Sequence, residues 1–252
     1  MSVLETAPPT FRNSELVEFL TRAGAAPNEE RDLRLLQCFL DGLRTANTTT
    51  NLTRILDDQD FWLKHVADSL ALGIVLPGVM VEAWRVADVG CGGGFPMVPL
   101  AWANSRLQIT GIEARRRKAD FVSGMCEELG LANCSVLPMQ AREAGRTEEH
   151  AGVYELLVMR AVGPPARMLR PCRQLLRRDI PAAVVFYMTP QAIAGERESA
   201  LREARKFGFL LRTSSPIALP GGAGSRQFLV AVKGTGPDSE VRRWHEGTTP
   251  LE

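Results

Sequence analysis

One stretch of the sequence, residues 84–96, constrains the fold more than any other. It reads Trp-Arg-Val-Ala-Asp-Val-Gly-Cys-Gly-Gly-Gly-Phe-Pro, so a short run that favours β-structure leads directly into closely spaced glycines. Glycines let the backbone turn tightly and approach a ligand where a Cβ atom would collide. The apolar segment 97–103 follows, and the first N–H groups of a helix have no partner within that helix. The pattern predicts a ligand-binding loop at the carboxyl end of the first strand of an open α/β sheet.

The glycine spacing and two acidic residues narrow the choice of ligand. A dinucleotide fingerprint reads G-x-G-x-x-G and a P-loop requires Gly-Lys-Ser/Thr, whereas this loop reads G-x-G-G-G. Asp88 precedes the first glycine and suits a cationic ligand group better than a pyrophosphate. Glu113 ends the next expected strand, near the ~20-residue spacing at which an acid receives ribose hydroxyls. Two acids favour S-adenosylmethionine over NAD; the alternative is that Asp88 caps a helix and Glu113 is only a strand-end charge.

The chain after residue 84 alternates between strand and helix patterns. Strands are predicted near 85–90, 107–113, 134–139, 154–160 and 182–188, and helices near 96–104, 115–129, 165–178 and 195–206. The runs 209–216 and 227–232 have no helix between them, so they predict an antiparallel hairpin at a sheet edge. Five α/β units closed by a hairpin form the class I methyltransferase fold, a Rossmann-like α/β fold with a mostly parallel, seven-stranded sheet.

The segments on either side of this domain differ in pattern. Residues 1–80 predict an N-terminal helical extension, with helices over 14–22, 31–46 and 61–76 and a loop rich in Asn and Thr over 47–53. The methyltransferase domain is expected to span 81–234. The C-terminal tail, 235–252, shows no periodicity and is expected to be loosely held, as are residues 1–13.

Composition and charge limit the function classes. The formal net charge over 252 residues is +1, so contact with a nucleic acid requires a local basic patch. The 5 cysteines are scattered and form no C-x-x-C pair, which supports neither a disulfide framework nor a zinc site. The N-terminus lacks a secretion-signal pattern, and the apolar run 70–81 is too short to span a bilayer. We expect a cytoplasmic protein without a metal or a membrane association.

Three motifs together resemble the glucose-inhibited division protein B family. They are Asn-Leu-Thr at 51–53, Lys-His-Val-Ala-Asp-Ser at 64–69 and the glycine loop with its Phe-Pro at 88–96. The similarity spans roughly residues 31 to 233. Members of this family are methyltransferases that modify N7 of a guanine in small-subunit (16S) ribosomal RNA. The resemblance therefore implies S-adenosylmethionine as the cofactor and 16S ribosomal RNA or the small ribosomal subunit as the partner, and we expect a monomer.

Individual residues receive roles from this resemblance. Cofactor contacts are expected for Asp88, Gly90, Gly92, Gly94, Phe95, Glu113, Ala141, Arg142 and Arg160. Substrate contacts are expected for His65, Asp68, Lys118 and Arg226. Arg160 is also the expected catalytic residue, because the carboxyl ends of strands face the ligand crevice. His65 and Asp68 lie one helical turn apart and are expected to meet, as a pair that orients the extension over the site.

The expected chemistry needs few acid–base groups. Guanine N7 has a free lone pair and no proton to remove, so the enzyme must chiefly align the reacting atoms and exclude water. Two sets of basic residues are candidates for RNA contact. They are the run 115–118 and the helically spaced Arg167, Arg170, Arg173 and Arg177.

The chain departs from the family pattern in three segments. Thr189 and Pro190 stand where Leu-Lys-Gly is usual, so an expected lysine is absent; Gln227 replaces a histidine, and Gln140 replaces an arginine. The departures leave two alternatives open: a related methyltransferase with a different substrate, and a cofactor-binding protein that contacts the ribosome without catalysis. An NAD oxidoreductase is a more distant alternative, given the glycine spacing.

Overall fold

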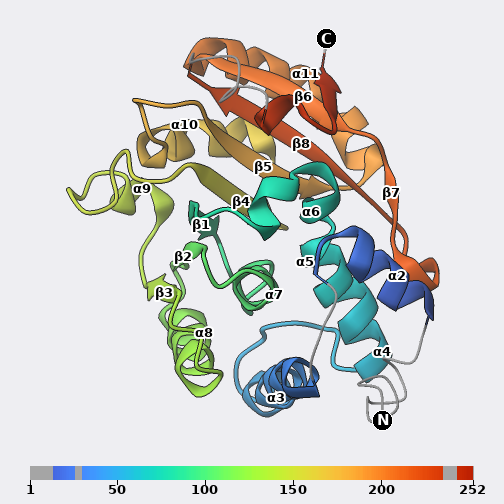
Figure 1. Cartoon of the computed structure of the whole chain (residues 1–252). Helices are drawn as coiled ribbons and strands as arrows, with labels where there is room; N and C mark the ends of the chain where they lie inside the picture. The colour runs from blue at the N-terminus through green and yellow to red at the C-terminus, as the bar shows by residue number, and fades with distance from the viewer. Residues whose placement is uncertain (1–13, 26–29, 235–242, 252) are drawn as a thin grey trace.

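A central β-sheet with helices on both faces organises the protein, whose computed structural model describes residues 14–25, 30–234 and 243–251 (Figure 1). Five parallel strands follow the order β3-β2-β1-β4-β5. They are β1 (Arg85–Val89), β2 (Gln108–Ile112), β3 (Cys134–Leu137), β4 (Leu156–Arg160) and β5 (Ala182–Met188). The strand order reverses between β1 and β4, and in such sheets this reversal opens a crevice at the carboxyl ends of the strands.

Antiparallel strands close the sheet beside β5. Strand β8 (Ser225–Lys233) pairs with β5 and with β6 (Phe209–Ser214), which confirms the expected hairpin. The connection holds β7 (Ile217–Ala218) and the short 3₁₀ turn η4 (Pro220–Gly222). All seven expected strands are present, and within the described residues the sheet gains two more, β7 and the C-terminal β9.

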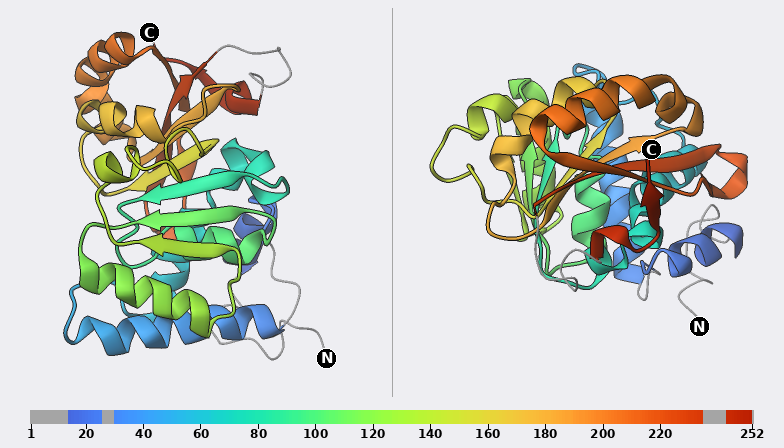
Figure 2. Two further views of the ribbon diagram at one scale, coloured as in Figure 1. Left: turned by 90° about the vertical axis from the view of Figure 1, so that its left-hand side faces the viewer. Right: turned by 90° about the horizontal axis from the view of Figure 1, so that it is seen from above.

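Alternating side chains divide the core into two layers. Along β5, Ala183 and Val185 join the cluster on one face, whereas Val184 and Phe186 join the cluster on the other. Helices α7 (Met97–Ala103) and α8 (Arg116–Glu128) cover the first face together with the N-terminal helices. The second face is covered by α9 (Ala141–Ala144), α10 (Pro165–Leu175) and α11 (Pro190–Phe207), and Figure 2 shows the two helical layers on opposite sides of the sheet.

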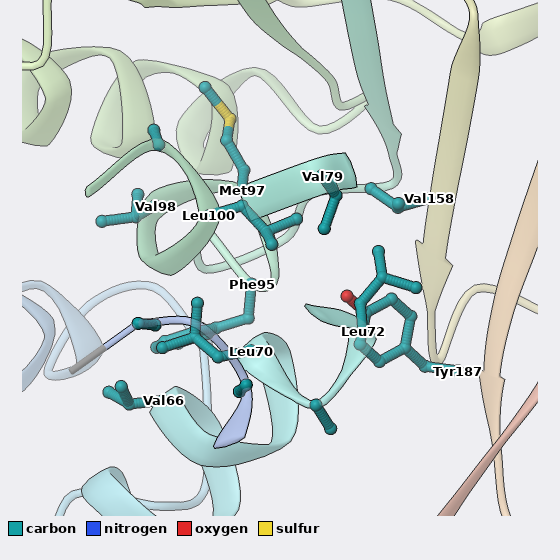
Figure 3. Packing of buried hydrophobic residues seen from close by; sticks show 14 of the residues in the cluster. Val66, Leu70, Leu72, Val79, Phe95, Met97, Val98, Leu100, Val158 and Tyr187 are labelled. Atoms are coloured by element: carbon teal, nitrogen blue, oxygen red, sulfur yellow. The ribbon is translucent and has the colours of Figure 1, made fainter. Parts of the chain in front are cut away.

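The N-terminal helices share their core with the sheet. They are α2 (Ser14–Arg22), α3 (Glu30–Asn47), α4 (Asp58–Asp60), η2 (Phe61–Ala67), α5 (Asp68–Leu70), α6 (Leu72–Val75) and the 3₁₀ turn η3 (Pro77–Met80). The single helix expected over 61–76 is therefore divided, and its first part, η2, is π-helical. Figure 3 shows Val66 and Leu70 from this segment packing in one cluster with Phe95 and Leu100. In the part of the chain that is described, no helix is long and apolar enough to cross a membrane.

The described part of the C-terminal tail is anchored, which corrects the expectation of a loosely held segment. Trp244 is fully buried, its ring centroid lies 5.2 Å from that of Trp84, and its indole N–H donates to the Pro181 carbonyl. Strand β9 (Thr248–Pro250) pairs with β6. One aromatic anchor and a three-residue strand leave no periodic signal in a sequence, so the pattern missed them. Residues 1–13 and 235–242 lie outside the described residues.

Replacing Trp244 with alanine tests this anchor. Loss of a fully buried tryptophan is expected to lower the free energy of unfolding by about 3–5 kcal/mol. Urea denaturation followed by circular dichroism measures the change. The matched control is Leu210→Ala, an apolar residue on β6 that is 66% exposed, for which a change below about 0.5 kcal/mol is expected. Equal effects of the two substitutions would contradict the anchoring role of Trp244.

Candidate functional site

A cavity of ≈ 840 Å³ lies at the carboxyl ends of the parallel strands, where the strand order reverses. Its walls come from the loops after β1, β2, β3 and β4, and from Leu52, Thr53 and His65 of the N-terminal extension. Segments far apart in the sequence therefore meet at one edge of the sheet, as the strand topology predicts.

The glycine loop forms one wall of this cavity. Gly90 donates its N–H to the Ile112 carbonyl (2.7 Å) and has φ 75°; a Cβ there would lie 2.7 Å from a methyl group of Val162. Gly94 has φ 95° and packs against Phe39, where a Cβ would lie 3.0 Å from the ring. Both positions combine a left-handed backbone with close packing, so they require glycine. Gly90 and Gly92 line the cavity, whereas Gly94 shapes the loop from behind.

Glu113 lies in the cavity wall with its carboxylate already bound to backbone. One oxygen accepts from the N–H of Gly92 (3.1 Å), and the other accepts from the N–H of Arg115 (2.8 Å). An ionised carboxylate offers about four lone-pair sites, so it can accept further hydrogen bonds from ligand hydroxyls. The strand-end position of Glu113 thus suits the expected ribose contact, and the same side chain fixes the glycine loop.

Asp88 lies beneath the loop and does not line the cavity. Its carboxylate is fully buried, and Oδ2 accepts from the N–H of Met97 (3.0 Å), the first residue of α7. Burial raises the pKa of this carboxyl to about 7, against the opposing effects of the Met97 N–H and the Arg160 charge. Asp88 therefore holds the helix start, as the alternative interpretation of the sequence proposed, and its expected contact with the cofactor stays a prediction.

Arg160 connects the sheet to the N-terminal extension. Its Nη2 donates to the Lys64 carbonyl (2.9 Å) and to His65 Nδ1 (2.9 Å), while its Nε lies 3.1 Å from Asp68 Oδ2. Asp68 is 1% exposed and also accepts a bidentate pair of hydrogen bonds from Arg226. The expected direct contact of His65 and Asp68 is not among the interactions of the described residues, because the Arg160 guanidinium binds both side chains.

His65 is buried and neutral. Its ring stacks on Phe95 with centroids 4.0 Å apart and planes 15° apart, and the guanidinium carbon of Arg160 lies 5.7 Å from the Phe95 centroid. Burial, followed by the positive charge of Arg160, lowers the pKa of His65 to about 3. The imidazole therefore carries no charge near neutral pH, which suits a positioning role.

Basic side chains surround the cavity. Those in its lining are Arg115, Lys118, Arg142, Arg146, Arg160, Arg167 and Arg170. Glu113 is the acidic side chain of the same lining. Lys118, Ala141 and Arg142 lie at the cavity as expected, whereas Arg173 and Arg177 do not line it, and Arg177 pairs with Asp179.

Two expected substrate residues lie away from the cavity lining. Asp68 and Arg226 bind one another behind Arg160, so the structure gives them a supporting position. Conversely, the sequence pattern of residues 47–53 predicts a loop rich in capping residues and does not single out Thr53. In the structure, Thr53 lines the cavity and lies 2.7 Å from His65 Nε2. Thr53 belongs to the Asn-Leu-Thr motif of the sequence, but its contact with His65 can be known only from the fold.

The donor and acceptor groups around the loop fit S-adenosylmethionine. Two buried polar atoms, Asp88 Oδ1 and Arg160 Nη1, have no hydrogen-bond partner among the described residues. Arg160 lines the cavity, so its unpaired Nη1 complements the carboxylate of the cofactor's methionine end, and Glu113 complements its ribose. Within the same residues, no group of three or more His, Cys, Asp or Glu side chains is arranged to hold a metal ion.

Comparison with known proteins places this site in a family. The family model for rRNA small subunit methyltransferase G matches residues 32–191. A protein named ribosomal RNA small subunit methyltransferase G from Deinococcus radiodurans is 32% identical over 209 residues, which are 82% of this chain and 79% of that protein. A protein of the same name from Thermosynechococcus vestitus is 40% identical over 149 residues, which are 56% of this chain and 62% of that protein.

Solved structures show the same fold at low sequence identity. An S-adenosylmethionine-dependent O-methyltransferase from Thermotoga maritima has a TM-score of 0.50 at 17% identity, covering 79% of this chain and 72% of that chain. An S-adenosylmethionine-dependent methyltransferase from Aquifex aeolicus has a TM-score of 0.50 at 14% identity, covering 70% of this chain and 93% of that chain. The expected class I methyltransferase fold is confirmed.

The buried carboxyl of Asp88 predicts a pH dependence of stability. Because its pKa is about 7 when folded but near 4 when unfolded, the folded state alone holds the proton between about pH 4 and 7. The contribution of Asp88 to the free energy of unfolding therefore falls as pH rises through this window and is constant above it.

Asp88→Asn removes this contribution while keeping an oxygen for the Met97 N–H. The stability of the variant relative to the natural protein is expected to rise from pH 4 to pH 7 in urea denaturation at stepped pH. Asp120→Asn, at an exposed carboxylate, controls for the loss of one negative charge. A difference for Asp88→Asn that stays constant with pH would contradict the pKa shift.

Proposed function

The chain belongs to the rRNA small subunit methyltransferase G family, and we propose that it transfers a methyl group from S-adenosylmethionine to N7 of a guanine in 16S ribosomal RNA. The observation that carries this proposal is the position of Arg160. At the carboxyl end of β4 it joins the cofactor loop, through Phe95, to the extension residues Lys64 and His65. Cofactor wall and substrate wall thus meet at one side chain.

The reaction places modest demands on this chain. When bound, S-adenosylmethionine supplies an activated methyl group on a sulfonium. Guanine N7 has a lone pair and no proton, so the protein has no proton to remove, and the neutral His65 is consistent with that. What the residues contribute is alignment: Glu113 and the glycine loop hold the cofactor, and Arg160 fixes the neighbouring wall.

The basic rim supports RNA as the substrate. Arg142, Arg146, Arg167 and Arg170 line the cavity, where phosphates can pair with them. N7 lies on an edge of the base that the deep, narrow major groove of A-form RNA hides. A loop or an opened base within the small ribosomal subunit is therefore the expected target, and we place the reaction in the cytoplasm, where that subunit is assembled.

Two of the departures from the family pattern lie away from the cavity. Thr189 caps the N-terminus of α11, where its hydroxyl accepts from the Ala192 N–H. Gln227 donates to Thr213 and to the Ser214 carbonyl within the terminal hairpin. Gln140 does line the cavity, and its backbone N–H donates to the Glu143 carboxylate (2.9 Å) at the start of α9. Thr189 and Gln227 thus hold positions within the fold, outside the cavity lining.

Methyl transfer to purified small ribosomal subunits that lack N7 methylation tests the proposal. The natural protein is expected to label a guanine, and Arg160→Ala to lower the rate by about 100-fold, because the wall beside the reacting atoms loses its anchor. Arg202→Ala, an exposed arginine on α11, is the matched control and is expected to retain the rate.

Titration with S-adenosylmethionine accompanies this assay to show that each variant binds cofactor. Cofactor binding by the natural protein without any label in RNA would contradict the proposed function. Label in a nucleotide other than guanine would point instead to a related methyltransferase with another substrate.

A further inference from the structure

Two hydrogen bonds hold the Thr53 hydroxyl in place, and two more fix the backbone that carries it. Asn47 Oδ1 accepts from the backbone N–H groups of Leu52 (2.8 Å) and Thr53 (3.1 Å). Thr53 Oγ1 accepts from the N–H of Ile55 (3.0 Å) and lies 2.7 Å from His65 Nε2. The side chain lines the cavity. A surface threonine is free to rotate, whereas this one is fixed before any ligand binds.

The neighbouring groups determine which way the Thr53 hydroxyl hydrogen points. A guanidinium only donates hydrogen bonds, so the 2.9 Å contact with Arg160 makes His65 Nδ1 the acceptor. The neutral imidazole then carries its hydrogen on Nε2 and donates it to Thr53. The Thr53 oxygen thus accepts two hydrogen bonds, which occupy both its lone pairs. Its own hydrogen has no acceptor among the described residues, so it remains available to a ligand in the cavity.

Thr53 lies beside His65, which binds Arg160 at the end of β4, so it is on the β4 side of the cavity. Glu113 and Ala141 follow β2 and β3, on the other side of β1, and suit the adenosine part of the cofactor, which leaves the β4 side for the methyl acceptor. The apolar part of the cavity lining includes Leu52, which precedes Thr53 in the chain, and Val162, which follows β4 and is 37% exposed. A flat base can pack against these apolar groups while one of its edges faces the hydroxyl.

Guanine and adenine differ at the position next to N7. Both bases have the acceptor N7. Beside it guanine has a second acceptor, O6, whereas adenine has an amino group that donates. A donor placed on N7 would occupy the lone pair that must attack the methyl group, but a donor placed on O6 leaves that lone pair free. If adenine occupied the site, the same donor would face the adenine amino group, which is also a donor. Neither group would then have a hydrogen-bond acceptor, which disfavours adenine.

We propose that Thr53 is a specificity residue whose hydroxyl donates a hydrogen bond to O6 of the target guanine. The hydrogen-bond chain from Arg160 through His65 sets the direction of that donor. This inference rests on the proposed function, because it assumes that guanine is the methyl acceptor in this cavity.

The test compares guanine with 2-aminopurine, a base that keeps N7 and lacks O6. The methylated guanine is first mapped in the reaction of the natural protein. Small subunits are then assembled from ligated RNA that carries guanine or 2-aminopurine at that position. The readout is the discrimination ratio, defined as kcat/KM for guanine divided by kcat/KM for 2-aminopurine. One hydrogen bond predicts a ratio of about fivefold to tenfold for the natural protein.

Variants at position 53 show whether Thr53 is the source of this ratio. Thr53→Val, which replaces the hydroxyl with a methyl group of similar size, is expected to lower the ratio by about fivefold to tenfold, the value of the lost hydrogen bond. Thr53→Ser, which keeps the hydroxyl, is expected to preserve the ratio. Thr53→Ala repeats the measurement if Thr53→Val does not bind S-adenosylmethionine in a titration.

Two outcomes would overturn the inference: a ratio near one for the natural protein, or an undiminished ratio after removal of the hydroxyl. Failure of the proposed function gives a different result, because no guanine would then be labelled by the natural protein at all. The two failures are therefore distinguishable in the same experiment.

Discussion

The buried ion cluster of Arg160, Asp68 and Arg226 is the interaction on which the site depends. Asp68 is 1% exposed, and the two guanidinium groups that bind it are 14% and 16% exposed. Removing one member leaves an unpaired charge in a poorly hydrated place, which is strongly destabilising. Because Asp68 belongs to the N-terminal extension and Arg160 and Arg226 to the sheet, this cluster fixes the extension relative to the cofactor loop.

The consequence of that attachment is a chain of oriented polar groups. Arg160 makes His65 an acceptor at Nδ1, and His65 in turn determines the direction of the Thr53 hydroxyl. The stack of His65 on Phe95 joins the same chain to the glycine loop. Groups that are oriented before the ligand binds need no reorganisation during the reaction. Methyl transfer to N7 removes no proton, so this orientation is the main contribution that the protein can make.

The sequence pattern predicted the parts of this structure that depend on local signals. The glycine loop, the strand-end Glu113 and the hairpin followed from spacing and alternation, while Ala141, Arg142 and Arg160 came from the family resemblance. Contacts between distant segments were not predictable. The helical spacing of His65 and Asp68 suggested that these two residues contact each other directly. In the structure Arg160, which lies 95 residues after His65 in the sequence, binds both of them. The burial of Asp88 beneath the loop, where it binds the first N–H of α7, is likewise a property of the fold that the sequence pattern does not contain.

A double-mutant cycle on Asp68 and Arg160 tests the central claim that these two residues act as one unit in methyl transfer. The variants are Asp68→Asn, Arg160→Met and their combination, with S-adenosylmethionine titration as the check on folding. We expect the double variant to lose no more activity towards small ribosomal subunits than the more damaging single variant. Losses that multiply, as for independent residues, would contradict it.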